Sequence, residues 1–308
     1  MDHTSRREFL RTTTGILGLT FLNAPAFKKK DPLLSFSTLG CPDWTFETIV
    51  NFAAAHDYKG IEIRGIKREL DLTKCPEFNT PQNILASYRL VKDKGLKFVD
   101  LGSSAALHHS EVKERQRNLD DGKRFIDLAQ EIRCPYIRVF PNNLPKDKER
   151  NAAIDLITKG LIELGDYAKG GNVMVLLETH GDLVKIADLR KVMESAASAY
   201  AGLVWDPMNM WSITKEPPAQ AYDTLRKYIE HTHIKDLKFV NSKLQYTLLG
   251  QGESPIFEAV DALSNGGYKG YYSFEWEKMW HPEIEEPEVA LADYPNVMKQ
   301  HFHQMKKQ

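Results

Sequence analysis

Short apolar runs alternate with longer amphipathic segments along most of this 308-residue chain, and this alternation restricts the fold more than any other feature. The runs recur at spacings of roughly 25 to 40 residues, and the gaps between them carry apolar residues at helical spacing. Ile154, Ile157, Leu161 and Leu164 show this spacing in one gap. Regular alternation of strand and helix implies a sheet of parallel strands. The expected strands are 34–37, 60–64, 97–101, 136–140, 173–177, 202–205, 231–234 and 271–275.

About eight strand–helix units predict an α/β protein built as a single closed (β/α)₈ barrel, a TIM barrel. The alternative is an open doubly wound sheet, but no glycine-rich phosphate turn follows the first expected strand. With 42% hydrophobic residues and no low-complexity linker, the sequence indicates one large domain over residues 27–308. Asp43 and Thr45 are candidate caps for a helix that carries Phe46, Ile49 and Val50 on one face.

The first 26 residues carry the features of an export signal. Arg6 and Arg7 form a twin-arginine pair, a weakly apolar stretch spans 15–22, and Ala24-Pro25-Ala26 is a small-x-small cleavage site. A chance arginine pair in a frayed terminus is the alternative. Because charge, apolar run and cleavage site occur in order, we predict a signal peptide over 1–26 and export to the periplasm by the twin-arginine route. The apolar run is too short for a stable membrane anchor.

Four successive expected strands end in residues that commonly ligate metals. These residues are Glu178, Asp206, His233 and Glu275. In a barrel the loops at the carboxyl ends of the strands build the active site, so the four side chains should converge there. Three carboxylates and one imidazole form a hard, oxygen-rich set. Such a set suits one divalent ion, with Mn²⁺, Mg²⁺ and Co²⁺ favoured and Zn²⁺ as a further candidate.

Alternation along the strands selects the side chains that face the barrel interior. On the seventh strand, His231, His233 and Lys235 share one face, with Lys235 expected above the cluster and nearer a substrate. The competing interpretation of the four acids and bases is purely structural, with the buried carboxylates neutralised by inward-facing cations. The inward candidates on the second and fourth strands are Glu62, Arg64 and Arg138.

Five motifs together are typical of one superfamily. They are Gly60-Ile61-Glu62-Ile63-Arg64, Leu177-Glu178-Thr179-His180, Val204-Trp205-Asp206, His231-Thr232-His233-Ile234-Lys235-Asp236 and Ser273-Phe274-Glu275-Trp276-Glu277. From about Leu34 to Met298 the sequence resembles the xylose-isomerase-like TIM barrels, which include sugar isomerases and epimerases, inosose dehydratases and apurinic endonucleases. The resemblance implies that the four strand-end residues hold one divalent metal and that Glu178 and Glu275 are the catalytic acid–base pair. Asn209 departs from the pattern, because several members have a histidine there.

The resemblance also implies an activity. The enzyme would be an isomerase or epimerase that removes a proton next to a carbonyl and uses the metal to stabilise the resulting enediolate. Export predicts an unphosphorylated sugar as the substrate. The candidate substrate-binding residues are His180, Asn209, Lys235, Arg138, Trp280, His281 and His108. For His180 the alternative is an orienting role, for Trp280 and His281 a loop anchor, and for His108 a solvated loop.

Two further function classes remain open. A lyase or dehydratase acting on a keto-sugar or 3-keto-glycoside begins with the same proton abstraction, and a non-catalytic sugar-binding module would lack metal affinity. An endonuclease is disfavoured by Asn209 and by a net charge of −1, which also argues against nucleic acid as a partner.

The three cysteines, Cys41, Cys75 and Cys134, show no metal-binding spacing and are expected to be buried thiols. The sequence leaves the oligomeric state open, with a homodimer among the options.

Overall fold

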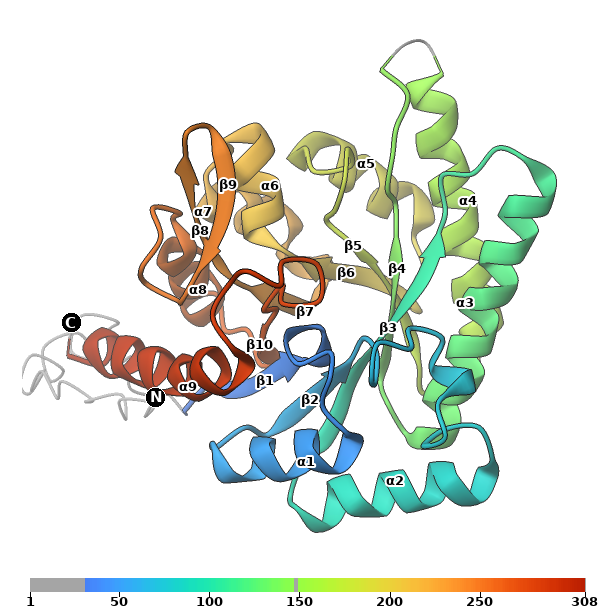
Figure 1. Cartoon of the computed structure of the whole chain (residues 1–308). Helices are drawn as coiled ribbons and strands as arrows, with labels where there is room; N and C mark the ends of the chain where they lie inside the picture. Colours follow the sequence, from blue (N-terminus) through green and yellow to red (C-terminus); the bar gives the residue numbers. More distant parts are fainter. Residues whose placement is uncertain (1–30, 147–148, 308) are drawn as a thin grey trace, which may run out of the picture. The chain divides into compact units, whose positions relative to one another are not determined.

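The computed structural model describes residues 31–146 and 149–307, and the predicted signal peptide lies outside these residues. Eight parallel strands close into a barrel in the order β1-β10-β7-β6-β5-β4-β3-β2 (Figure 1). The predicted single (β/α)₈ barrel is therefore confirmed, and the doubly wound alternative is wrong. The barrel strands are β1 (Leu33–Ser37), β2 (Gly60–Ile63), β3 (Lys97–Ala106), β4 (Tyr136–Phe140), β5 (Met174–Glu178), β6 (Ala201–Trp205), β7 (Ile229–Ile234) and β10 (Tyr271–Phe274).

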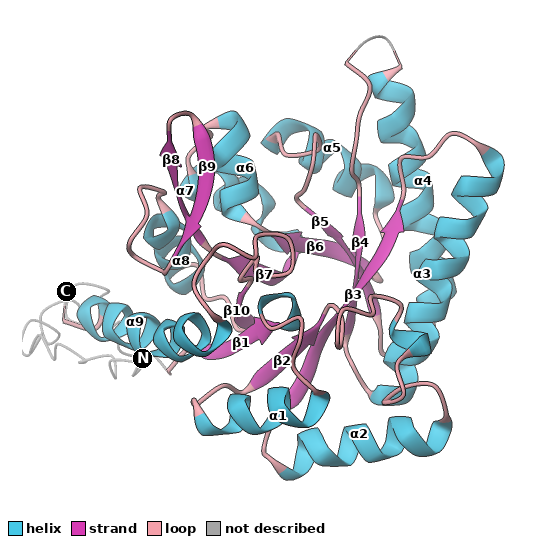
Figure 2. Cartoon of the chain, viewed as in Figure 1, coloured by secondary structure: helices cyan, strands magenta, loops and turns pink. Residues whose placement is uncertain are grey.

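Helices surround the barrel and cover the outer faces of its strands (Figure 2). Three 3₁₀ turns, η1 (Thr38–Gly40), η2 (Leu72–Lys74) and η3 (Arg226–Tyr228), join some of the elements. The structure describes no helix that is long and apolar enough to cross a membrane. The helices are α1 (Phe46–Ala55), α2 (Pro81–Asp93), α3 (Val112–Ile132), α4 (Arg150–Ala168), α5 (Ile186–Ala196), α6 (Pro207–Thr214), α7 (Pro218–Leu225), α8 (Ile256–Asn265) and α9 (Pro287–Met305).

Local signals in the sequence explain several of these boundaries. The Thr45 hydroxyl caps α1 by accepting the N–H of Thr48 at 3.2 Å. The other candidate cap, Asp43, pairs with the Arg68 guanidinium at 2.7 Å instead. In α6 the cap is Asp206, whose Oδ1 accepts the N–H groups of Met208 and Asn209. Oδ1 of Asp206 thus caps the helix, while Oδ2 faces the barrel interior.

The barrel interior is more polar than is usual for this fold, in which branched apolar residues dominate. On β2 the outward residues Ile61 and Ile63 are fully buried against the helices, while Glu62 between them is fully buried inside the barrel. Asp100 on β3 is also fully buried, and burial raises its pKa to about 8. The strands therefore place an apolar layer outside the barrel and a charged, hydrogen-bonded layer inside it.

An antiparallel hairpin that the sequence analysis did not predict follows β7. It consists of β8 (Asp236–Val240) and β9 (Lys243–Thr247). Asn241 and Ser242 turn the chain with positive φ angles of 50° and 61°, as a two-residue hairpin turn requires. The Asp236 carboxylate fixes the hairpin's return path by accepting the N–H groups of Gly250 and Gly252, both at 2.9 Å.

The three cysteines, Cys41, Cys75 and Cys134, are buried and unpaired thiols, as expected. Burial raises the pKa of Cys41 and of Cys134 well above the ordinary value of a thiol. They behave as small apolar residues of the core, because the thiolate is the reactive form and burial disfavours it.

Candidate metal centre and active site

Four side chains meet inside the barrel at the carboxyl ends of their strands. Glu178 is the last residue of β5, Asp206 directly follows β6, His233 lies in β7, and Glu275 directly follows β10. One potential ligand atom from each lies within 4.8 Å of the others, and all four side chains are buried. The structure thus brings together all four residues that the sequence analysis chose as metal ligands.

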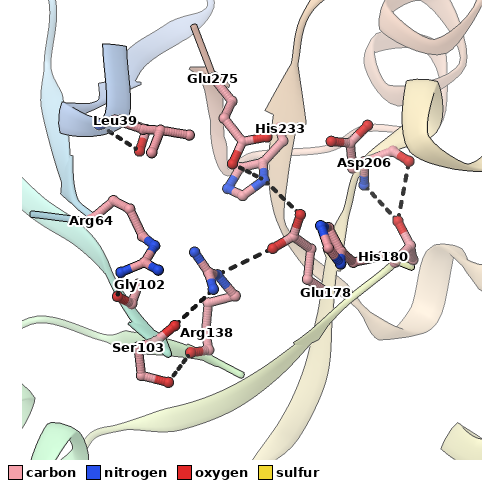
Figure 3. A network of polar contacts seen from close by, with 12 residues as sticks. Leu39, Arg64, Gly102, Ser103, Arg138, Glu178, His180, Asp206, His233 and Glu275 are labelled. Carbon is pink, nitrogen blue, oxygen red and sulfur yellow. Dashed lines mark hydrogen bonds and ion pairs between the residues drawn. The ribbon is translucent and has the colours of Figure 1, made fainter. Parts of the chain in front are cut away.

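Carboxylate oxygens of the cluster surround one imidazole nitrogen, Nδ1 of His233. Nδ1 of His233 lies 3.4 Å from Glu178 Oε1 and 3.2 Å from Glu275 Oε1 (Figure 3). His233 Nδ1 and Asp206 Oδ2 are buried and make no hydrogen bond within the part of the chain that the structure describes. Buried polar atoms normally have such a partner. Asp206 Oδ2 does lie 2.8 Å from the Lys235 ammonium, and together with His233 Nδ1 and one oxygen each of Glu178 and Glu275 it forms a donor set that fits a divalent cation.

Glu62 sits below His233 and sets the orientation of its ring. Its Oε2 lies 3.2 Å from His233 Nε2, 2.9 Å from His231 Nε2 and 3.0 Å from the Ser273 hydroxyl that donates to it. Burial alone would raise the pKa of Glu62, but the charge on His233 and the hydrogen bonds from both imidazoles hold it well below its ordinary value. Because an ionised carboxylate only accepts, His233 donates from Nε2 and keeps Nδ1 toward the cluster.

The protonation of His233 depends on the same neighbours. Burial disfavours the imidazolium, yet the carboxylates of Glu275, Glu62 and Glu178 raise the pKa of His233 well above its ordinary value. A proton and a cation would compete for Nδ1. A cation bound among the carboxylates would replace that proton, since a metal ligates neutral imidazole.

We therefore predict that Glu62→Gln weakens metal binding while leaving the four cluster residues intact. The amide offers one acceptor oxygen and places an N–H₂ group against imidazole N–H groups, so the orientation of His233 is lost. The expected loss in affinity for Mn²⁺ is about 10- to 100-fold, the usual effect of removing a partner behind a metal ligand. Calorimetric titration with Mn²⁺ measures it. Ser273→Ala, which removes only one donor to the same oxygen, is the matched control, and an equal loss there would contradict the prediction.

Lys235, which was predicted to lie above the cluster and nearer a substrate, directly follows β7 and is buried. Its Nζ lies 2.8 Å from Asp206 Oδ2, 2.7 Å from Glu275 Oε2 and 2.8 Å from Glu277 Oε1. Burial opposes the ammonium form, but these carboxylates raise the pKa of Lys235 well above its ordinary value. Lys235 is therefore a cation held between carboxylates at the edge of the cluster.

The arrangement is compatible with both the metal and the structural interpretation of the buried acids, because each glutamate divides its two carboxylate oxygens between two neighbours. Glu178 directs Oε2 to Arg138 Nε at 3.1 Å and Oε1 toward His233. Glu275 directs Oε2 to Lys235 and Oε1 toward His233. One oxygen of each glutamate is thus neutralised by a fixed cation, and the other points to the centre of the cluster.

Two further residues predicted for the substrate site border the cluster. Asn209, in the first turn of α6, donates from Nδ2 to Glu178 Oε1 at 3.4 Å. His180 lies beyond Glu178, and its Nδ1 is 3.0 Å from Asn142 Oδ1. Asn142 and Glu277 were not predicted as site residues, since Asn142 lies in the loop after β4 and Glu277 in the loop after β10. Thr179, like Glu277, appeared only within a motif, and it hydrogen-bonds the backbone of Asp206.

The loop after β10 forms part of the rim. Trp280 is 53% exposed there, and His281 lies 3.2 Å from Glu283 Oε1. Lys278 holds the loop from within, because its Nζ donates to the carbonyls of Pro282 and Ile284 at 2.8 and 2.7 Å. In the loop after β3 the His108 ring lies tilted by 34° against that of His109, and no hydrogen bond or ion pair joins His108 to the cluster within residues 31–146 and 149–307.

The fold and the buried cluster define a class of protein: a (β/α)₈ barrel with a candidate metal centre at the carboxyl ends of its strands. A family model described as "Xylose isomerase-like TIM barrel" matches residues 50–301, and the chain belongs to this family.

Several characterised proteins are similar to the chain. Fructoselysine 3-epimerase from Shigella flexneri is 22% identical over 173 residues, which make up 55% of this chain and 62% of that enzyme. The chain therefore spans less than two thirds of the length of the curated relatives it matches.

Solved structures at low identity share the fold. The probable 3-DHS dehydratase AsbF from Bacillus anthracis has a TM-score of 0.72 at 15% identity, over 86% of this chain and 98% of that chain. The 3-keto-D-glucoside 4-epimerase YcjR from E. coli has a TM-score of 0.69 at 16% identity, over 88% of this chain and 100% of that chain. A xylose isomerase-like TIM barrel protein from Mycobacterium smegmatis in complex with magnesium has a TM-score of 0.65 at 16% identity, over 88% and 96%.

Proposed function

We propose that this protein is a divalent-metal-dependent sugar isomerase or epimerase whose acid–base pair is Glu178 and Glu275. The observation that carries the proposal is the approach of these two carboxylates to His233 Nδ1 from different strands, with Oε1 atoms at 3.4 and 3.2 Å. Proton transfer on opposite sides of one carbon needs two such groups. The epimerases among the similar proteins support the same reaction class.

Both glutamates are ionised in the structure, so either could remove the α-proton, and the other would have to take up a proton before it could return one on the opposite side of the carbon. Burial and the charge of Glu275 would raise the pKa of Glu178, but His233 and Arg138 bring it below its ordinary value. Burial would also raise the pKa of Glu275, yet His233 and Lys235 lower it. Glu178, Asp206, His233 and Glu275 would hold the cation. When bound, a divalent cation would supply positive charge beside the carbonyl and hydroxyl oxygens of the substrate.

The test is exchange of the substrate's α-proton with solvent. A panel of unphosphorylated ketoses in deuterated water with Mn²⁺ should show deuterium at the carbon next to the carbonyl, followed by nuclear magnetic resonance. Exchange that requires the metal and yields an isomer whose mass differs from the substrate only by the incorporated deuterium supports the proposal. A protein loaded with Mn²⁺ that binds a sugar without exchange would be a binding module instead.

A dehydratase is the second candidate, and Glu277 favours it. Burial raises the pKa of this carboxyl above its ordinary value, although Lys235 partly offsets the effect, so Glu277 would take up a proton more readily than Glu275, whose pKa is lowered. Elimination needs such an acid to protonate the departing oxygen after the α-proton has left. Incubation with a 3-keto-glucoside separates the two reactions, because elimination after removal of the C2 proton expels the aglycone alcohol from C1 and lowers the mass of the sugar product, whereas epimerisation does not.

The predicted export leads to a preference for unphosphorylated sugars. Phosphate groups are commonly bound by helix N-termini or glycine-rich backbone nests, whereas the described cluster presents carboxylates, an imidazole and hydrogen-bonded cations. In a competition assay against a bound ketose, D-fructose should displace the ligand at lower concentration than D-fructose 1-phosphate. The reverse order would remove this specificity and would speak against export of the enzyme.

A further inference from the structure

Two arginines place their guanidinium groups beside one another next to Glu178. Arg64 follows β2, Arg138 lies in β4, and Gly102 of β3 separates them (Figure 3). A Cβ atom at Gly102 would lie 2.8 Å from Arg64 Cδ and 3.0 Å from Arg138 Nη2. The absence of a side chain at Gly102 therefore allows both arginines to extend into the same space.

The positive charge of this pair exceeds the negative charge that contacts it. Arg138 pairs with Glu178 at 3.1 Å and donates to the Ser103 carbonyl at 2.7 Å. Arg64 is only 5% exposed, yet no carboxylate lies within ion-pairing distance of it in the described part of the chain. It donates only to neutral acceptors, the Gly102 carbonyl at 3.4 Å and the Ser104 hydroxyl at 3.1 Å.

Each of the two guanidinium groups also has an N–H group that makes no hydrogen bond in the described part of the chain. Nε of Arg64 and Nη2 of Arg138 have no acceptor among residues 31–146 and 149–307. Burial and the charge of Arg138 lower the pKa of Arg64 to about 9, so Arg64 is still a cation at neutral pH. Adjacent buried cations with unused donors are costly unless an anion joins them.

We propose that Arg64 and Arg138 form a binding site for a carboxylate of the substrate, so that the sugar turned over here is a keto sugar acid. This inference rests on the proposed function, because it assigns the substrate class of that same site. A planar carboxylate matches the fork of a guanidinium, and two neighbouring forks can share its two oxygens. Leu39 and Met279, joined by a backbone hydrogen bond of 3.2 Å, line a small cavity that Arg64 also lines.

The choice of a carboxylate over a phosphate follows from what surrounds the pair. Glu178 already neutralises part of the charge of Arg138, which leaves about one positive charge for an incoming group. A doubly charged phosphate would add repulsion from Glu178. The carboxylate would anchor one end of the sugar while its carbonyl end reaches the cluster around His233.

Binding of three matched ketoses in the presence of Mn²⁺ tests the proposal. The probes are D-fructuronate, D-fructose and D-fructose 6-phosphate, titrated calorimetrically into the parent protein and into Arg64→Met. We expect the parent to bind D-fructuronate at least about tenfold more tightly than D-fructose, and Arg64→Met to lose this difference by weakening only the acid. The control is Arg117→Met, which removes an exposed arginine paired with Glu114 on α3 and should leave all three affinities unchanged.

Three results would overturn the proposal: equal binding of D-fructuronate and D-fructose by the parent, tightest binding of D-fructose 6-phosphate, or an equal loss for acid and neutral sugar in Arg64→Met. The comparison within the parent decides the matter if the variant fails to fold. Binding and exchange separate the two proposals. Tight binding of the acid without α-proton exchange removes the acid–base function and keeps the carboxylate site, whereas exchange on D-fructose without preference for the acid does the reverse.

Discussion

Replacing Glu178 or Glu275 with glutamine lowers the rate of α-proton exchange by about 10²- to 10⁴-fold, the range that general acid–base groups contribute. Each side chain keeps its size and one oxygen for the cluster, but the amide cannot take up a proton. The Oε1 atoms of both residues face His233 Nδ1, so both substitutions act at the centre of the site. Exchange of deuterium into a ketose, measured at saturating Mn²⁺, gives the rate.

Two controls make this result specific. Metal content must be measured in each variant, because a lost cation would also stop exchange. Glu163→Gln provides the matched surface substitution, since Glu163 pairs with Lys123 on neighbouring helices and should leave exchange unchanged. If both Glu178→Gln and Glu275→Gln exchange protons at the parental rate, the two glutamates are not the acid–base pair.

Replacing Asp206 with alanine abolishes metal binding while the barrel remains folded. The substitution removes Oδ2 from the cluster and leaves Lys235 with Glu275 and Glu277 as its remaining partners. It also removes the cap of α6, which lowers the free energy of unfolding by about 1 kcal/mol. Elemental analysis after equilibration with Mn²⁺ measures the metal, and circular dichroism measures the fold.

Asp206→Asn distinguishes the two roles of this side chain. The amide oxygen still accepts the N–H groups of Met208 and Asn209, so α6 stays capped and thermal stability is close to that of the parent. The negative charge at the cluster is gone, so metal affinity still falls. An Asp206→Ala protein that retains as much Mn²⁺ as the parent would show that the cation binds elsewhere.

The charges in the cluster explain why substitutions there should have large effects on activity, metal binding and stability. Glu178 and Glu275 each face a fixed cation on one side and the imidazole on the other. A substitution there removes a catalytic oxygen and also leaves a buried arginine or lysine with fewer partners. Stability measurements should therefore accompany every activity measurement, because an unpaired buried charge typically costs several kcal/mol.

The predicted features that the structure confirmed are those that repeat along the chain. Strand and helix periods set the barrel, and Thr45 caps its helix because a hydroxyl before an apolar face satisfies the first free N–H groups. Strand ends were less well predicted. β3 continues to Ala106, and β5 includes Glu178, because pairing with the neighbouring strands extends them beyond their apolar runs.

The hairpin β8–β9 shows why other features were missed. Its strands mix charged and apolar residues in a short segment, and Asn241-Ser242 is a weaker turn signal than a pair with glycine. What fixes the segment is the Asp236 carboxylate, which binds backbone N–H groups more than ten residues away along the chain. A contact of that kind leaves no periodic trace in the sequence.

The sequence by itself determined the barrel, its closure by parallel strands and the convergence of Glu178, Asp206, His233 and Glu275, because strand period and strand ends follow from local residue order. Only the tertiary structure decided how charges are shared inside it. In the structure Lys235 pairs with three carboxylates and Glu62 lies behind His233, while Arg64 has no acidic partner among residues 31–146 and 149–307. Such pairings depend on which side chains from distant strands reach the same few ångströms, and that is set by the register and closure of the barrel.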